Sequence, residues 1–315
     1  MRAKVKAAAS GTEEYEELTW LLRRSASLLR GGIPVGRVLG FVLDSEPEAV
    51  TASPRLAEIG ARITAAPDVP RALAAAGSPA WRIAAAAWLI GERSGAPMAT
   101  VLDRLAVATQ ALIDVAHRRA VLVAGPSATV RLVAWLPPAA IGMGLALGLN
   151  PLPVFVTPLG ITLVVIGALL EWCGVRWARR MMTSVARADR IVAVECELLW
   201  IALAGGAPPG LARRWVATAV DEVGAEWVPF VELMDTSAAG RVLAMARQTG
   251  VPAGALLLEA ASLARAHATT QLERDAERLG VRVLIPLAAC ILPAFVALGV
   301  VPVLVSLLSG VGQIG

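Results

Sequence analysis

The chain of 315 residues is 57% hydrophobic and only 17% charged, with a net charge of +4. Its only lysines are Lys4 and Lys6, which excludes a phosphate-binding loop of the Gly-x-x-x-x-Gly-Lys type. Three widely spaced cysteines match no zinc or Cys-x-x-Cys pattern, and small apolar packing residues are what we expect there: Cys173, Cys196 and Cys290.

The first 127 residues are predicted to form a cytoplasmic helical bundle. Apolar residues recur at helical spacing between Tyr15 and Leu29, and again between Leu102 and Ala116, with charged residues off each stripe. No run alternates with the period of a β-strand. A polar insert from Asp44 to Pro54 has the composition of a loop.

Two long stretches of the chain contain no Asp, Glu, Lys, Arg or His. They run from Leu132 to Leu170 and from Val283 to Gly315. A helix crossing a hydrocarbon core of roughly 30 Å needs about 20 apolar residues, and backbone in lipid must satisfy its own hydrogen bonds. We therefore predict an all-α integral membrane protein. The turn signal from Gly148 to Pro153 divides the first stretch, so the three predicted transmembrane helices are residues 132–149, 152–170 and 283–309.

Arginines flank the predicted spans on one side of the membrane only, and the short loop between the first two spans has none. Because positive residues remain cytoplasmic, we expect a multi-pass protein of the plasma (inner) membrane with a cytoplasmic N-terminus and an extracytoplasmic C-terminus. Residues 175–280 would then form a second cytoplasmic helical bundle. Much of the basic excess lies beside the spans, so nucleic-acid binding is not expected.

The two cytoplasmic segments resemble each other. Residues 28–34 (LLRGGIP) correspond to 202–208 (ALAGGAP), and residues 95–102 correspond to 250–257 at an offset of 155. The offset barely changes at the Leu-Pro pairs ending at Pro137 and Pro293. This order predicts a duplicated unit, although helix–Gly–Pro–helix punctuation can also occur in any Ala/Leu-rich bundle. Glycine ends a helix in the left-handed conformation, and proline starts the next.

Turn residues and membrane glycines are the candidate structural or interaction residues. The turn residues of the first copy are Gly31, Gly32, Pro34, Gly91, Glu92, Ser94, Gly95 and Pro97, and those of the second are Gly205, Gly206, Pro208, Gly250 and Pro252. Gly144 and Gly148 form a G-x-x-x-G that allows close helix packing in the membrane or a tight hairpin. Prolines in the spans are expected to kink them: Pro137, Pro138, Pro158, Pro286, Pro293 and Pro302.

The turn Gly91-Glu-Arg-Ser-Gly95, followed by Pro97, resembles the G-E-x-S-G element of the type II secretion system protein F family, which includes platform proteins of type IV and Tad/Flp pili. The turn that ends at Pro34 resembles the family's L-L-x-x-G-x-P element. The layout of bundle, two spans, bundle and third span covers essentially the whole chain. The second copy reads Ala246-Arg-Gln-Thr-Gly250 and lacks the Glu.

The resemblance implies a non-enzymatic inner-membrane platform of a type II secretion or pilus assembly machine. Its implied partners are a hexameric cytoplasmic ATPase, pilin-like subunits, the lipid bilayer and further copies of itself. Glu92 is expected to cap or pair across its turn near Arg93. No catalytic, cofactor or metal site is expected, since His117 and His267 are the only histidines. Two alternatives stay open: a transporter subunit working with a separate ATPase, and a membrane-anchored regulatory protein.

Overall fold

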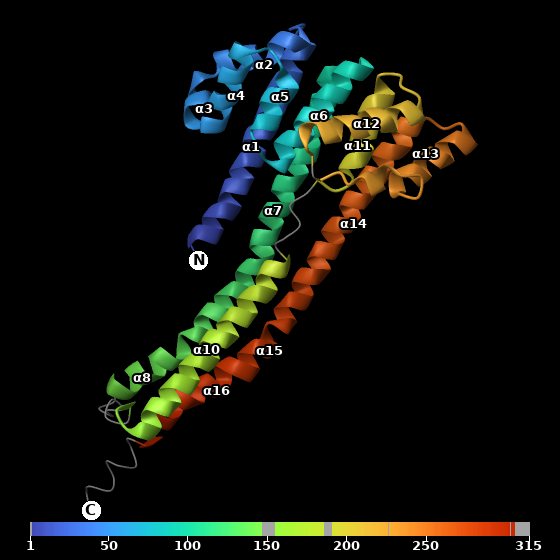
Figure 1. The fold of residues 1–315 in the computed structure, drawn as a ribbon. Coiled ribbons are helices and arrows are strands. Elements are labelled where there is room, and N and C mark those ends of the chain that lie inside the picture. The colour runs from blue at the N-terminus through green and yellow to red at the C-terminus, as the bar shows by residue number, and fades with distance from the viewer. Residues whose placement is uncertain (1, 147–154, 186–190, 226, 303, 306–315) are drawn as a thin grey trace, which may run out of the picture. The chain divides into compact units, whose positions relative to one another are not determined.

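The computed structural model describes residues 2–146, 155–185, 191–225, 227–302 and 304–305 (Figure 1). The described residues contain helices, turns and bends but no strand, so the predicted all-α fold is confirmed. Before the first apolar stretch the helices are α1 (Arg2–Arg30), α2 (Val35–Ser45), α3 (Pro47–Ala52), α4 (Pro54–Ala65), α5 (Val69–Ala75) and α6 (Pro79–Ser94). The remainder are α7 (Met98–Ala134), α8 (Leu136–Ala146), α10 (Pro158–Val185), α11 (Val194–Ala204), α12 (Pro209–Val223), η1 (Phe230–Leu233), α13 (Ala238–Thr249), α14 (Ala253–Arg282), α15 (Leu284–Pro286), η2 (Leu287–Ile291), α16 (Leu292–Phe295) and η3 (Val296–Val300).

The chain divides into two compact units. The first comprises Met1–Ala116 and Asp189–Thr269, and the second comprises His117–Ala188 and Thr270–Gly315. Helices α7 and α14 contribute residues to both units. The first unit thus combines most of the two segments that the sequence predicts as separate bundles, and buried residues from both segments form one hydrophobic core.

Helix α6 is the most deeply buried helix of the first unit. Trp81 and Trp88 lie seven residues apart, which places them on one face, and each is at most 1% exposed. Four consecutive alanines between them, residues 84–87, are fully buried. Small side chains let neighbouring backbones approach closely, and α6 contacts α5, α11 and α12. This helix of the first copy therefore packs directly on two helices of the second.

The polar insert from Asp44 to Pro54 is not a loop, so that prediction is wrong. Residues 47–52 form α3, with Pro47 in the first turn, where a missing N–H costs nothing. Ser53 then caps α4, because its hydroxyl accepts a hydrogen bond from the Leu56 amide at 3.3 Å. Proline and serine act here as helix starters.

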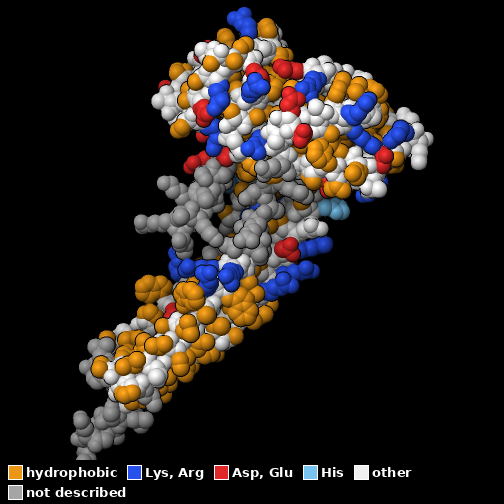
Figure 2. Space-filling model, in the orientation of Figure 1, with side chains coloured by type: hydrophobic (Ala, Val, Ile, Leu, Met, Phe, Trp, Pro, Cys, Tyr) orange, Lys and Arg blue, Asp and Glu red, His pale blue; other side chains and the backbone are white. Residues whose placement is uncertain are grey.

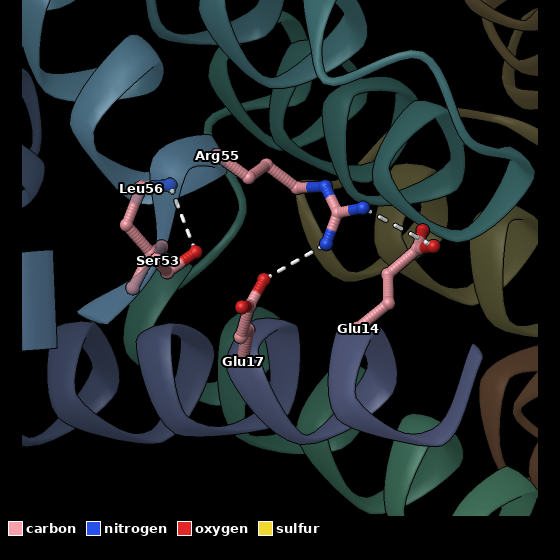
Figure 3. A network of polar contacts seen from close by, with 5 residues as sticks. All are labelled: Glu14, Glu17, Ser53, Arg55 and Leu56. Carbon is pink, nitrogen blue, oxygen red and sulfur yellow. Dashed lines mark hydrogen bonds and ion pairs between the residues drawn. The ribbon is translucent and has the colours of Figure 1, made fainter. Parts of the chain in front are cut away.

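Arg55 at the start of α4 fixes this part of the chain to α1 (Figure 3). Its guanidinium lies 2.8 Å from Glu17 Oε2 and 3.5 Å from Glu14 Oε2. Burial raises the pKa of the Glu14 carboxyl above its usual range, and the charge of Arg55 counteracts part of that rise. One arginine therefore holds two carboxylates of adjacent turns of α1.

Three helical segments are long and apolar enough to cross a membrane: Met98–Ala146, Gly160–Met182 and Ala253–Val300. These three segments indicate a multi-pass membrane protein. The bounds differ from the predicted spans. The second apolar helix begins at Pro158 and continues past residue 170 to Val185, and the first and third spans are continuations of long helices. Residues 147–149, 152–154, 303 and 306–309 of the predicted spans lie outside the described residues.

The prolines of the spans act in two ways. Pro137 follows a break at Trp135, between α7 and α8, and both Pro286 and Pro293 adjoin π-helical turns. Pro158, in contrast, does not kink a span but stands at the first residue of α10. A π-helical turn holds one residue more than an α-helical turn. The turn at Leu287–Ile291 thus accounts for the rise in offset from 155 at Gly95 to 156 at Pro137.

Glycines allow the apolar helices of the second unit to pack closely. A Cβ built at Gly167 would lie 2.5 Å from Leu298 Cγ, and one at Gly174 would lie 2.9 Å from Cys290 Cβ. A Cβ at Gly299 would similarly lie 2.9 Å from Ala140 Cβ. Of the two glycines predicted for packing, Gly144 is buried in α8, whereas Gly148 lies outside the described residues.

Candidate functional site

The Gly-Gly-x-Pro turns of the two copies have the same backbone conformation. Gly32 has φ +92° and Gly206 has φ +90°, a left-handed conformation that favours glycine. Their hydrogen bonds also correspond, since the Ile33 amide donates to the Leu28 carbonyl at 3.1 Å and the Ala207 amide donates to the Ala202 carbonyl at 3.3 Å. Pro34 and Pro208, each in extended conformation, precede α2 and α12. Gly31 and Gly205 end the preceding helices.

The second pair of turns is equally alike. Gly95 ends α6 with φ +70° and Gly250 ends α13 with φ +73°. Each turn is followed by a proline, Pro97 or Pro252, directly before a long helix, α7 or α14. Both kinds of turn therefore recur in the same order and conformation, as a duplicated unit predicts.

Side-chain pairs also recur at equivalent positions. In the first copy, Arg23 of α1 donates to Gln110 of α7 at 3.3 Å. The offsets of 174 and 155 place Glu197 of α11 and Arg265 of α14 at those two positions, and these residues form an ion pair of 2.9 Å. A polar contact thus occurs at equivalent positions of both copies. The arginine lies on the first helix of the pair in the first copy and on the second helix of the pair in the second copy. The Glu197 side chain is 6% exposed and that of Arg265 is 25% exposed, so the second pair is the more buried.

The Gly-Glu-Arg-Ser-Gly turn of the first copy meets the Gly-Gly turn of the second. The Ser94 hydroxyl points at two carbonyl oxygens, those of Gly91 at 3.4 Å and Ile201 at 3.5 Å. A Cβ built at Gly205 would overlap Ser94. Gly91 is buried, and a Cβ there would overlap the Met98 sulfur. Close packing against the Ser94 backbone therefore leaves no room for a side chain at Gly205, and Ser94 lies at the contact between the copies.

Two arginines of α6 extend this contact along α12. Arg93 forms an ion pair of 2.6 Å with Glu222, and Arg82 donates to the Gly224 carbonyl at 2.9 Å. We call the set Arg82, Arg93, Ser94, Gly205, Glu222 and Gly224 the inter-repeat contact. The sequence motifs include Ser94 and Gly205, but the four other residues carry no motif signal.

Glu92 is expected to cap or pair across its turn near Arg93, whereas in the structure it bonds to the helix that precedes the turn. Its carboxylate accepts a hydrogen bond of 2.7 Å from the Trp88 indole, one turn earlier on α6. The geometry of the helix explains the difference, because adjacent residues point about 100° apart whereas residues i and i+4 share a face. Glu92 itself is exposed, so its outer surface faces solvent beside the inter-repeat contact.

The second copy has Arg247 where the first has Glu92. Arg247 lies 3.9 Å from Asp235, which also binds Arg213. The hydrogen bond from Arg213 lowers the pKa of the Asp235 carboxyl, and the positive charge of Arg213 lowers it further. This cluster stabilises the connection between α12 and α13, and the two copies therefore differ in charge at this turn.

Contacts by a tryptophan further connect the two segments. The Arg104 guanidinium of α7 lies 4.8 Å from the centre of the Trp200 ring of α11. Gly254 of α14 makes room for that ring, since a Cβ there would lie 3.2 Å from Trp200 Cδ1. At the equivalent positions the first copy has Ala26 and Ala99. Two alanines of the first copy therefore correspond to a tryptophan and a glycine in the second.

Among the described residues, no group of three or more His, Cys, Asp or Glu side chains could hold a metal ion. The contacts described above make the candidate site a packing and ion-pair surface between the two repeated segments. Comparison with protein-family models, curated proteins and solved structures finds no match to this chain.

Proposed function

We propose that this protein is a non-enzymatic inner-membrane platform of a type II secretion or pilus assembly machine, in the manner of the type II secretion system protein F family. The observation that carries the proposal is a pair of turns that occurs twice, with left-handed glycines at 32 and 95 in the first segment and at 206 and 250 in the second. The second turn of each pair leads into a helical segment that is long and apolar enough to cross a membrane. The Gly91–Gly95 turn adds the family's motif at the point where the repeats meet.

In this proposal the repeats lie in the cytoplasm and present their outer surface to a hexameric ATPase. The C-terminus is extracytoplasmic, and copies of the chain associate around membrane-held pilin-like subunits. The inter-repeat contact would keep the two copies in a fixed relation while force passes along α7 and α14, the two helices that contribute to both units. The described spans have no charged residue between Leu132 and Leu170, which argues against ion or solute binding there.

Co-purification tests the proposal. The full chain, tagged and extracted in mild detergent from its native cells, is cross-linked and its partners are identified by mass spectrometry. Recovery of a secretion-type hexameric ATPase, reduced in a Gly91→Leu variant that remains in the membrane, supports the platform. Recovery of an ATP-binding-cassette subunit instead would establish the transporter alternative and overturn the proposal.

A further inference from the structure

The helices of the second unit carry a strong net positive charge outside their apolar stretches. Residues 117–182 and 270–302 contain nine arginines and four acidic residues, a net charge of +5. The arginines are Arg118, Arg119, Arg131, Arg176, Arg179, Arg180, Arg274, Arg278 and Arg282. Figure 2 shows basic side chains gathered at the end of the apolar stem of this unit. Within the described residues, five of these arginines form no ion pair: Arg131, Arg176, Arg179, Arg274 and Arg282.

One stripe of α10 changes from apolar to cationic along its length. Val165, Leu169 and Trp172 follow one another at helical spacing and are each about 60% exposed, at 61%, 59% and 59%. Arg176 continues the stripe one turn after Trp172, and Arg179 follows. A helix rises about 1.5 Å per residue, so Val165 to Arg176 spans roughly 16 Å, about half of a hydrocarbon core of roughly 30 Å.

The tryptophan and the first arginine of the stripe are in contact. The Arg176 guanidinium lies 5.3 Å from the centre of the Trp172 ring. This cation–π contact restricts the guanidinium while its N–H donors remain exposed, because Arg176 itself is exposed. A planar guanidinium donates two parallel hydrogen bonds to a phosphate.

We infer that this stripe binds an anionic glycerophospholipid. The phosphodiester headgroup contacts Arg176 and Arg179, the glycerol region lies against Trp172, and an acyl chain lies along Leu169 and Val165. The apolar half of the stripe selects a lipid rather than a soluble anion, since only a lipid carries a chain continuous with its phosphate. The net charge of the surrounding arginines favours an anionic headgroup over a zwitterionic one.

Quenching of Trp172 fluorescence by brominated lipid tests the inference. The full chain is reconstituted in bilayers that mix phosphatidylglycerol and phosphatidylcholine, with either lipid brominated on its acyl chains. The part of the signal lost in a Trp172→Phe variant reports the lipid at this stripe, and it yields the relative binding constant of the two lipids. We expect phosphatidylglycerol to be preferred at least fivefold, with the preference falling as NaCl concentration rises.

The Arg176→Gln/Arg179→Gln variant should reduce the preference towards one, because each arginine near a charged surface contributes about a fivefold factor. The matched control is Arg37→Gln/Arg214→Gln, which removes the same charge from exposed positions of the first unit and should leave the preference unchanged. A relative constant near one in the wild type, or an equal loss in both variants, would overturn the inference. Far-ultraviolet circular dichroism confirms that each variant is folded.

Discussion

Arg118 and Glu273 occupy equivalent positions of the two repeats, 155 residues apart, and Arg118 Nη1 lies 3.4 Å from Glu273 Oε1. Equivalent positions meet when two like helices run parallel and in register, and α7 and α14 run in the same direction in Figure 1. Both side chains are about half exposed, at 60% and 49%, so the pair contributes little to stability. The pair shows instead that α7 and α14 lie side by side in register, and this register supports the duplication inferred from the turns.

The packing of Ser94 on Gly205 predicts that the second Gly-Gly turn tolerates no side chain at its first glycine. Gly205→Ala should lower the free energy of unfolding by about 2 kcal/mol, because overpacking a close contact costs roughly 1–3 kcal/mol. The control is Gly210→Ala in the first turn of α12, where a Cβ would meet nothing within 4 Å. Thermal unfolding of the purified protein in detergent measures both, and equal stabilities for the two variants would refute the contact.

The ion pair between Glu197 and Arg265 predicts an asymmetry between the repeats. Glu197→Ala leaves a partly buried guanidinium without its carboxylate and should cost about 2 kcal/mol, a value reduced from that of a fully buried pair because Arg265 is partly exposed. Arg23→Ala, at the equivalent position of the first copy, should change stability by less than about 0.5 kcal/mol, since its contact is exposed.

A double-mutant cycle checks this assignment. Glu197→Ala and Arg265→Ala together should cost less than the sum of the two single variants, because the second change removes the charge that the first leaves unpaired. Additive effects would show that the two side chains do not interact.

Cys196 predicts a pH dependence of stability in the alkaline range. Burial raises the pKa of this thiol to about 12, and the carboxylates of Glu195 and Glu197 contribute to the rise. Above the ordinary value of 9.0, the unfolded chain releases this proton while the folded chain retains it. The contribution of this thiol to the free energy of unfolding is therefore fully present below pH 9.0 and is lost as pH rises towards about 12.

Chemical denaturation between pH 8 and 11 measures the effect as the difference between the wild type and Cys196→Ala. The variant should lose less stability than the wild type over this range. Identical pH profiles for the two proteins would mean that the folded thiol ionises normally.

The close approach of α10 to the third apolar segment predicts that Gly174 cannot be enlarged. Gly174→Leu should separate these helices and lower the melting temperature in detergent by several degrees, since Cys290 and Ile291 lie within 3 Å of the position of a Cβ. Gly142→Leu on α8 is the matched control, because a Cβ at that position meets nothing within 4 Å. A greater loss in the control would contradict the packing.

Periodicity and punctuation predicted the helices, the three apolar segments and both pairs of turns, because these depend on local chemistry. Long-range packing was not predictable in the same way. Nothing local indicates that Arg93 reaches Glu222, 129 residues later, or that α6 packs on α11 and α12 within a single core. Gly167 and Gly174 did leave a signal in the sequence, a seven-residue spacing that keeps them on one helix face. The segment from Asp44 to Pro54 was wrongly predicted as a loop because proline and serine begin helices as readily as they mark turns.

Three crossings of the membrane, with both repeats on the same side, are the claim on which the account depends most. Epitope tags placed before Met1, after Val251 and after Gly315 are each tested for protease access in spheroplasts and in inverted membrane vesicles. We predict that the first two tags are cleaved only in inverted vesicles and the third only in spheroplasts. A third tag that is cleaved together with the other two would mean an even number of crossings and would contradict the account.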